Sequence, residues 1–325
     1  MGGRRPGLAA VTWRAPTAAD VPAWVDLLAA VESVDRTGEV IDGDEITAML
    51  GLSSVDPARD VRLAWEEDTP VGFVSVLDPA RGSPRRIAIE GAVRPNRRRR
   101  GIGAALLEWA VQRAEEHVAE RPVEGEAWLE VGAGEGDTGR EALFRALGFT
   151  PVRYYFEMRR PLAADVPYPA VPRGLALVPF DPARDEDVRA AHNEAFRDHW
   201  GSAPIEPETW LTWVTGARDF RADCSFLVLD GDDVAGYALN ALHPADWAGL
   251  GFREGWTHQL GVRRPWRGRG VARALLHATM RAFRAEGMDF ATLDVDSENP
   301  TGALALYQHA GYRRERCRVA WSRPL

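Results

Sequence analysis

Lysine is absent from the 325-residue sequence, so all 40 of its basic residues are arginine. A codon bias toward GC-rich triplets is the ordinary explanation of such a composition. The absence still excludes chemistry that needs a lysine side chain, such as Schiff-base formation or phosphate binding by the lysine of a P-loop.

Cysteine is scarce as well, because Cys224 and Cys317 are the two in the chain, one in each half. Without a C-x-x-C pair, the sequence predicts neither a disulfide framework nor a structural zinc site, and it fits a reducing cytoplasm. The seven histidines show no H-E-x-x-H or other metal-binding spacing, and no G-x-S-x-G nucleophile motif occurs. We therefore expect no metal centre.

Long hydrophobic runs are also missing. No stretch approaches the 18 apolar residues that span a membrane, and the N-terminal region lacks a segment long enough for a signal peptide. We expect a soluble, unprocessed cytoplasmic protein with no membrane partner. The net charge of −8 argues against a nucleic-acid partner. Hydrophobic residues make up 45% of the chain, which is enough for real cores, and its length predicts two domains.

A proline-rich stretch divides the chain. Four prolines fall within residues 161–174, and such a density prevents a helix or a central strand. We expect a linker here, between an N-terminal domain over residues 1–160 and a C-terminal domain over residues 175–325.

The two halves show the same order of expected elements. In the first half we expect strands at 11–17, 61–66, 71–78, 85–93, 127–131 and 153–160, and helices at 18–33, 44–50, 102–120 and 140–147. In the second half we expect strands at 175–180, 225–230, 234–242, 256–262, 290–295 and 313–321, and helices at 185–196, 207–215, 271–286 and 301–309. Each half is then an α+β unit with a mixed sheet.

Matched positions in the halves support an internal duplication. Gly270 follows Gly101 by 270 − 101 = 169 residues, and Tyr312 follows Phe149 by 312 − 149 = 163 residues. Two matched points at similar offsets, with the same elements between them, indicate two copies of one unit.

The sharpest motif lies between the fourth strand and the long helix of each half. Residues 93–103 and 262–272 both fit V-x(4)-R-x-x-G-x-[GA]. Glycine or alanine lets the backbone N–H groups of a helix N-terminus approach an anion closely, and the arginines add charge-assisted hydrogen bonds. We interpret the motif as a pyrophosphate cradle. A Rossmann fingerprint does not fit, because the third glycine is absent and the motif follows a fourth strand.

At this point the chain resembles the GCN5-related N-acetyltransferase (GNAT) superfamily, in tandem. That family's motif R/Q-x-x-G-x-G/A matches Arg98 to Gly103 and Arg267 to Ala272. Its later motif, an asparagine followed by L-Y-x-x-x-G-F/Y, matches Asn299 and residues 306–312, whereas residues 143–149 keep the framework with Phe144 at the tyrosine position. The resemblance implies two GNAT domains of α+β (mixed α/β) class, each with a mostly antiparallel sheet flanked by helices.

The resemblance also implies acetyl-CoA as the cofactor that donates the acetyl group. The residues expected to hold it in the second half are Leu260, Gly261, Val262, Arg267, Gly268, Arg269, Gly270, Val271, Ala272 and Asn299. Those in the first half are Val93, Arg98, Arg99, Arg100, Gly101, Ile102 and Gly103. The alternative for the arginine run 97–100 is a solvated basic patch or a nucleic-acid contact.

By the same resemblance, Tyr307 is the general acid that protonates the departing CoA thiolate. Phe144 has no proton to give, so we expect the first half to be non-catalytic while still able to hold CoA. The alternative for Tyr307 is an ordinary core aromatic.

The general base is left open. Many family members carry a glutamate six residues before the position of Val262, where this chain has Trp256. Because side chains alternate along a strand, His258 shares a face with Trp256 and is one candidate. Glu254, a water relay and a purely structural role for His258 are the alternatives.

The acceptor site in this family is lined by the segment after the first strand of the domain. Here that segment contains Asp198, His199 and Trp200, and with Trp256 these are the expected substrate residues. Aromatic rings beside carboxylates suit a cationic amine, although ordinary surface packing explains the same residues.

We expect the second half to transfer an acetyl group to a primary amine of a small molecule, by direct attack in a ternary complex. The tandem layout is similar to that of the mycothiol synthase group, but the fourth-strand glutamate of that group is missing here. The competing classes are a non-catalytic acyl-CoA sensor and, least favoured by the net charge, a nucleic-acid binder. The sequence does not indicate an oligomeric state.

Overall fold

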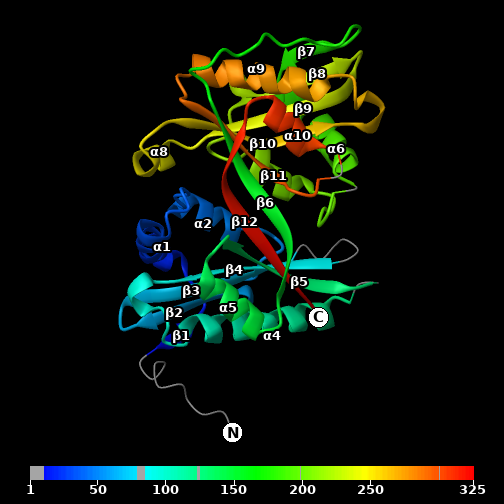
Figure 1. The fold of residues 1–325 in the computed structure, drawn as a ribbon. Coiled ribbons are helices and arrows are strands. Elements are labelled where there is room, and N and C mark those ends of the chain that lie inside the picture. Colours follow the sequence, from blue (N-terminus) through cyan, green and yellow to red (C-terminus); the bar gives the residue numbers. More distant parts are fainter. Residues whose placement is uncertain (1–10, 79–84, 123–124, 198, 300) are drawn as a thin grey trace. The chain divides into compact units, whose positions relative to one another are not determined.

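The computed structural model describes residues 11–78, 85–122, 125–197, 199–299 and 301–325. They form two compact units. Unit 1 comprises Met1–Val152 and Val319–Leu325, and unit 2 comprises Arg153–Arg318 (Figure 1). Each unit is a mixed α/β structure. Among the described residues, no helix is long and apolar enough to cross a membrane.

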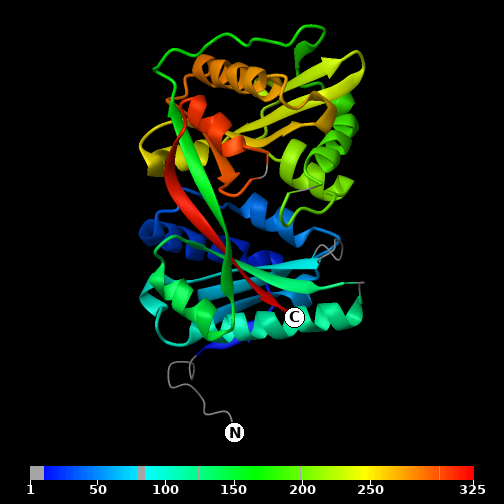
Figure 2. The ribbon, with the colours of Figure 1, turned by 45° about the vertical axis from the view of Figure 1, so that its right-hand side comes forward.

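Unit 1 places five strands in the order β1-β2-β3-β4-β5. The strands are β1 (Thr12–Arg14), β2 (Val61–Glu66), β3 (Thr69–Leu77), β4 (Arg85–Val93) and β5 (Ala127–Gly134), and the helices are α1 (Val21–Asp35), α2 (Gly43–Leu50), α3 (Pro57–Asp60), α4 (Ile102–Glu120) and α5 (Thr138–Ala146). All pairs are antiparallel except β4 with β5, which are parallel from Arg85↔Ala127 to Ala88↔Glu130. Helices cover both faces of the sheet (Figures 1 and 2).

Apolar side chains of α1 and α2 fill one side of the unit 1 sheet. Trp24 of α1 packs on Phe73 of β3, with ring centroids 5.0 Å apart. Helix α4 lies against the same strand through a close approach at Gly72, where a Cβ atom would meet Leu106 at 3.0 Å. Because both faces are covered, β3 is buried along almost its whole length.

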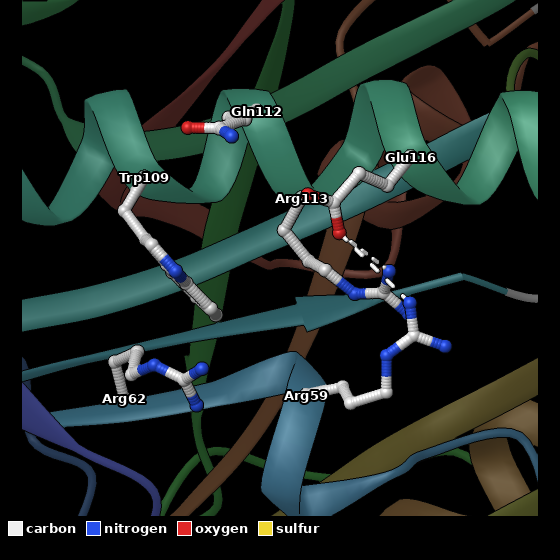
Figure 3. Close-up of a pocket in the computed structure, with 6 residues that line it drawn as sticks. All are labelled: Arg59, Arg62, Trp109, Gln112, Arg113 and Glu116. Atoms are coloured by element: carbon white, nitrogen blue, oxygen red, sulfur yellow. Dashed lines mark hydrogen bonds and ion pairs between the residues drawn. The ribbon is translucent and has the colours of Figure 1, made fainter.

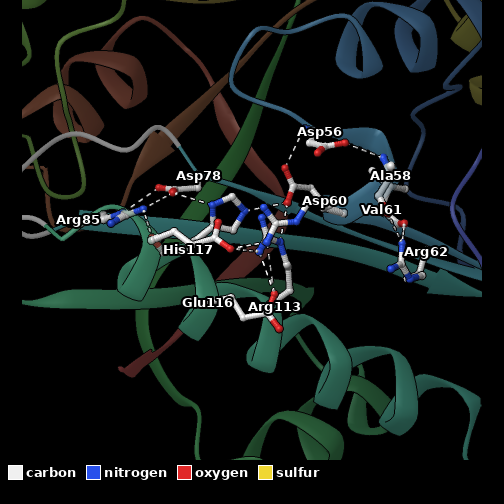
Figure 4. Close-up of polar contacts among 12 residues, drawn as sticks. Asp56, Ala58, Asp60, Val61, Arg62, Asp78, Arg85, Arg113, Glu116 and His117 are labelled. Atoms are coloured by element: carbon white, nitrogen blue, oxygen red, sulfur yellow. Dashed lines mark hydrogen bonds and ion pairs between the residues drawn. The ribbon is translucent and has the colours of Figure 1, made fainter.

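A buried charge cluster joins α4 to the sheet of unit 1 (Figure 4). Asp60 accepts hydrogen bonds from Arg113 Nε and His117 Nε2, both at 2.8 Å. Asp78 pairs with Arg85 and lies 3.3 Å from His117 Nδ1. All five side chains are buried, so their charges depend on one another for compensation.

Unit 2 places its strands in the order β7-β8-β9-β10-β11-β6. The strands are β6 (Thr150–Pro161), β7 (Ala176–Pro179), β8 (Phe226–Asp230), β9 (Asp233–Leu242), β10 (Glu254–Val262), β11 (Phe290–Asp296) and β12 (Arg313–Pro324), and the helices are α6 (Asp185–Ala195), α7 (Pro207–Trp210), α8 (Pro244–Leu250), α9 (Val271–Ala285) and α10 (Ala303–His309). The pairs are antiparallel except β10 with β11, which are parallel.

Helices α9 and α10 pack on one face of the unit 2 sheet, and α6 and α7 pack on the other. Phe283 and Tyr307, from α9 and α10, share a core with Leu293 of β11. Val188 of α6 and Trp210 of α7 share another with strands β8 and β9. The apolar side of these helices therefore faces the sheet, as the spacing of their apolar residues predicts.

Two strands are divided between the units, at β6 and β12. Residues Tyr155–Pro161 of β6 pair with β11 of unit 2, whereas the end of β12 lies in unit 1, where Ser322 Oγ donates to Leu129 O at 2.9 Å. The boundary between the two units, after Val152, therefore differs from the domain limits expected near residues 160 and 175. Residues 162–175, all described, carry no helix or strand, and Leu162 and Val166 of this linker are buried in the core of unit 2.

Candidate functional site

The second motif forms a loop with left-handed glycines before α9. A short 3₁₀ turn (Arg264–Trp266) follows β10, and Gly268 and Gly270 then adopt φ angles of 72° and 92°. A Cβ atom at Gly268 would meet nothing within 4 Å, so neighbouring protein does not require this glycine; its backbone conformation does. The N–H groups of the first turn of α9, at Val271 and Ala272, have no intrahelical acceptor and form a site suited to an anion.

The first motif repeats this loop at the offset of 169 residues. Gly101 has a φ of 90°, and Arg99 occupies the second left-handed position with a φ of 63°. The arginine of each motif bonds its own strand in the same way: Arg98 Nε donates to Val93 O and Arg267 Nε donates to Val262 O, both at 3.0 Å. The predicted duplication therefore extends to hydrogen bonds.

The two motif arginines differ in what else they contact. Arg98 makes a two-pronged ion pair with Asp35, at 2.6 and 2.8 Å, whereas Arg267 Nη2 donates to the Ala195 carbonyl at 2.8 Å. Both side chains thus brace the loop against the C-terminal end of the first α-helix of the unit, α1 or α6, a role that the sequence did not indicate. In unit 1 the arginine charge is also compensated by a carboxylate.

Strand β10 has a β-bulge at His258, next to the point where its pairing with β11 ends. The register with β9 shifts between Thr257↔Asn240 and Gln259↔Leu239, which leaves His258 as the extra residue. The parallel ladder from β10 to β11 ends at Thr257↔Leu293. Residues Gln259 to Val262 therefore have no partner on β11, and their backbone groups on that side are available to a ligand.

Unit 1 lacks this bulge. Its corresponding strands, β3 and β4, pair in unbroken register from Gly72↔Val93 to Leu77↔Ala88. The parallel ladder of unit 1 ends at the matching place, Ala88↔Glu130, so the copies share the opening beside the loop and differ in the bulge and at Phe144 and Tyr307.

Tyr307 lies on the α9 and α10 side of the opening. Its side chain is 7% exposed, and burial raises its pKa, so the phenol stays protonated at neutral pH. Its ring centroid is 6.0 Å from that of Tyr312. It is also near Tyr237 of β9, whose pKa is raised first by burial and then by Tyr307.

Phe144 occupies the corresponding place in unit 1. Its ring contacts Phe149 and Trp321, with centroids 6.1 and 5.9 Å away. Both copies close the helix in the same way, because Phe149 N donates to Phe144 O and Tyr312 N donates to Tyr307 O at 3.0 Å. The two units therefore share this hydrogen bond at the end of the helix, but Phe144 lacks the hydroxyl that Tyr307 carries.

Three side chains of β10 line the face of the sheet opposite α9. Trp256 Nε1 donates to Glu254 Oε1 at 2.9 Å, and the Trp256 ring stacks on His258 with centroids 5.9 Å apart and an interplanar angle of 21°. The predicted shared face of Trp256 and His258 is therefore present. Thr257, between them, is buried on the other side.

Glu254 is fully engaged by neighbouring donors. It is 3% exposed and accepts from Arg159 Nε at 2.8 Å, from Thr292 Oγ1 at 2.7 Å and from Trp256. Nearby, burial raises the pKa of Glu157 to about 7, against the opposing effect of Arg316 and then Arg159.

His258 is exposed and hydrogen-bonded to a second histidine. Its Nε2 lies 2.8 Å from Nε2 of His243. Surrounding protein displaces water from the ring and, with a smaller effect from His243, lowers the pKa of His258. The imidazole is therefore neutral at pH 7. His243, which follows the last residue of β9, was not predicted from the sequence.

The expected substrate residues fall in different surroundings. Asp198 lies outside the described residues. His199 packs on Phe196, with ring centroids 4.3 Å apart, and Trp200 lies under the Arg153 guanidinium at 5.2 Å. Asn299, expected to contact the cofactor, uses its Oδ1 to accept from Thr301 N and Oγ1 at 2.9 and 2.6 Å and so shapes the loop before α10.

A separate hollow of about 140 Å³ lies between α4 and the α3–β2 segment of unit 1 (Figure 3). It is lined by Arg59, Arg62, Trp109, Gln112, Arg113 and Glu116, none of which the sequence motifs singled out. Its arginines are already engaged, because Arg113 pairs with Glu116 at 2.9 Å and Arg62 lies over the Trp109 ring at 4.7 Å. We assign no ligand to it.

Comparisons with known proteins match both halves of the chain. The model of the acetyltransferase (GNAT) family matches residues 32–149 and 186–312. A mycothiol acetyltransferase of Salinispora arenicola is 29% identical, with 94% of each chain covered, and one of Geodermatophilus obscurus is 31% identical over 91% of this chain and 94% of that one. The crystal structure of a GCN5-related N-acetyltransferase from Sphaerobacter thermophilus has a TM-score of 0.75 and 26% identity, covering 97% of this chain and 96% of that one.

The two regions that match the family model each contain one glycine loop, one helix ended by the same backbone hydrogen bond, and one sheet that opens beside the loop. The chain therefore belongs to the GNAT family of acetyl-CoA-dependent N-acetyltransferases and carries two copies of the family's domain.

Proposed function

We propose that unit 2 transfers the acetyl group of acetyl-CoA to a primary amine of a small molecule, by direct attack in a ternary complex. The observation that carries this proposal is the opening between β10 and β11 beside a helix N-terminus, next to the bulge at His258 on the β9 side of β10. Tyr307 lies on one side of that opening and His258 on the other. A thioester placed in the opening has an acid on the side of its sulfur and a base on the side of the attacking amine.

The loop before α9 is suited to hold the pyrophosphate of the donor. The open space at Gly268 and Gly270 and the unpaired N–H groups at Val271 and Ala272 fit an anion of this size, and Arg267 keeps the loop in shape. In this proposal, a backbone N–H group between Leu260 and Val262, beyond the end of the β11 pairing, polarises the thioester carbonyl.

Tyr307 is the proposed general acid. As the C–S bond breaks, its phenol gives a proton to the CoA sulfur, and its raised pKa keeps that proton in place until the thiolate forms. Phe144 lacks this proton and β4 lacks the bulge, which supports a non-catalytic unit 1. The ion pair between Arg98 and Asp35 is expected to weaken CoA binding there.

His258 is the proposed general base, and the surroundings of Glu254 support this choice. Three donors occupy the Glu254 carboxylate, which is buried, whereas His258 is exposed and neutral at pH 7. A base must present an accepting lone pair to the amine, and His258 meets that condition.

The acceptor is proposed by analogy with relatives. Curated proteins that match most of this chain are named mycothiol acetyltransferases, so a small-molecule amine of that type is the first to test. Trp256 stands where many family members have a glutamate, which favours a different fit around the amine. The two free, buried cysteines support a reducing, cytoplasmic setting.

Release of free CoA from acetyl-CoA, measured with a panel of small primary amines, tests the proposal. We expect release that depends on the amine, and loss of it in Gly270→Ala, whose methyl group enters the open space of the loop. Gly101→Ala, the matched change in unit 1, is expected to leave the rate intact. Tight CoA binding without amine-dependent release from any member of the panel would instead support a sensor and overturn the proposal.

A further inference from the structure

We propose that Asp219 and His243 are positioning residues that hold His258 in the tautomer needed for a base, with the lone pair on Nδ1. This inference rests on the proposed acetyl transfer and deepens it, because it explains how a histidine replaces the glutamate that many family members carry at the position of Trp256.

The three side chains form a continuous chain of polar contacts. Asp219 Oδ2 lies 3.0 Å from His243 Nδ1, and His243 Nε2 lies 2.8 Å from His258 Nε2. The side chains of His243 and Asp219 are 24% and 16% exposed, so protein covers most of the link while His258 remains open to solvent.

The backbone fixes the first two members. Leu242 N donates to Asp219 O at 3.0 Å, and an isolated bridge joins Phe220 to Ala241 of β9. His243 follows Leu242 directly and caps α8. The loop of Asp219 is therefore hydrogen-bonded to the end of β9, and the His258 ring lies against His243.

The order of donors sets the tautomers. The Asp219 carboxylate is an acceptor, so His243 carries its hydrogen on Nδ1. With a single proton, on Nδ1, His243 presents a lone pair on Nε2, and His258 Nε2 donates to it. The remaining nitrogen of neutral His258, Nδ1, is left with the accepting lone pair.

Neighbouring groups hold the His258 ring and set its charge. Trp256 stacks on one face, and the ring of His243 meets it at an interplanar angle of 90° with centroids 5.0 Å apart. The charged groups that face this chain are Asp219 itself, Arg218 at 3.3 Å from Asp219, and the Glu254–Arg159 pair behind Trp256.

The proton balance follows from this arrangement. As the amine nitrogen bonds to the acetyl carbon, one N–H bond of the amine breaks and the proton goes to His258 Nδ1. The positive charge on His258 is stabilised through His243 by the carboxylate of Asp219. The proton leaves to solvent from the exposed imidazole, and no other reactant is needed.

The test compares His258→Ala, His243→Ala, Asp219→Asn and the double variant His243→Ala/His258→Ala in steady-state kinetics across pH. We expect His258→Ala to lower kcat by about 10²–10³-fold and His243→Ala by about 10-fold or more, with KM for acetyl-CoA unchanged. His243→Ala should cost nothing further once His258 is gone. In Asp219→Asn the acid limb of kcat/KM should move to lower pH, because the negative charge that favours protonated His258 is removed.

His277→Ala, on α9, is the matched histidine control, and its kinetics should equal those of the wild type. Equal thermal stability and CoA binding in all variants shows that the fold is kept. Two results with an active wild type would overturn the positioning role without affecting the proposed function. In the first, His243→Ala keeps the wild-type rate. In the second, the losses from His243→Ala and His258→Ala multiply in the double variant. Loss of wild-type activity with a chelator would also overturn it, in favour of a metal between the two Nε2 atoms.

Discussion

Replacing Asp60 by Asn tests the buried charge cluster that fixes α4 in unit 1. Asp60 is 1% exposed and accepts from Arg113 Nε, His117 Nε2 and Asp56 N, each at 2.8 Å. An amide in its place removes the buried carboxylate that Arg113 Nε and His117 Nε2 share, while Arg113 Nη1 keeps its partly exposed pair with Glu116. Removing one partner of a buried ion pair costs about 3–5 kcal/mol, which is a large share of the roughly 5–15 kcal/mol that stabilises a domain.

Hydrogen exchange measured on peptides of α4 is the direct assay. We expect protection to fall by roughly two to four orders of magnitude in Asp60→Asn, with α9 of unit 2 as the internal reference. Asp56→Asn is the matched control, because Asp56 caps α3 from an exposed position and asparagine caps as well. A loss smaller than tenfold in α4, or an equal loss in the control, refutes the energetic account of this cluster.

The same cluster gives stability a defined dependence on pH. Hydrogen bonds to Asp60 and then Asp78 raise the pKa of His117 above its usual 6.5, so its contribution is complete below pH 6.5 and is lost as pH rises through the folded value. Burial opposes ionisation of Asp60, but the bond from His117 and the other donors outweigh it and lower its pKa below 3.8. Its contribution is lost as pH falls through that lower value. Unit 1 should therefore be most stable at pH values above the lowered pKa of Asp60 and below the raised pKa of His117. Asp60→Asn should reduce the loss of stability on the alkaline side.

Two further changes address the loops. Gly270→Ala places a Cβ atom in open space, with Arg273 nearest at 3.7 Å, but at a φ of 92°. We expect a modest strain of about 1–2 kcal/mol and at least a tenfold loss of CoA affinity by calorimetry; unchanged affinity would remove the loop from the binding site. Asp35→Asn frees Arg98 from its ion pair, so the affinity of unit 1 for CoA should rise, and an unchanged or lower affinity would show that the pair does not compete with the ligand.

The features of this structure that depend on neighbouring residues could be predicted from the sequence. The motif loops, the helix over residues 102–120 and the contrast between Phe144 and Tyr307 depend on residues close together in the chain, where glycine and amphipathic period act directly. The expected helix at 207–215 is present as α7 followed by a π-helical turn over Leu211–Thr215.

Features that depend on pairing between distant segments were not predicted. The bulge at His258 is a mismatch of register between β9 and β10, and no single residue type requires it. The link from Asp219 to His243 joins residues 24 apart and depends on the isolated bridge between Phe220 and Ala241. The division of β6 and β12 between the units likewise depends on which strands they join, and periodicity does not specify a partner.

The central claim is that Tyr307 supplies the proton to the leaving sulfur in unit 2. Amine-dependent CoA release by Tyr307→Phe tests it most directly, with Tyr312→Phe as the matched control. The Tyr312 hydroxyl is buried without a hydrogen-bond partner among the described residues, so its loss breaks no such bond. We predict that Tyr307→Phe lowers kcat by about 10²–10⁴-fold with CoA affinity unchanged, while Tyr312→Phe keeps the wild-type rate. Full activity in Tyr307→Phe, or equal losses in the two variants, would contradict the account.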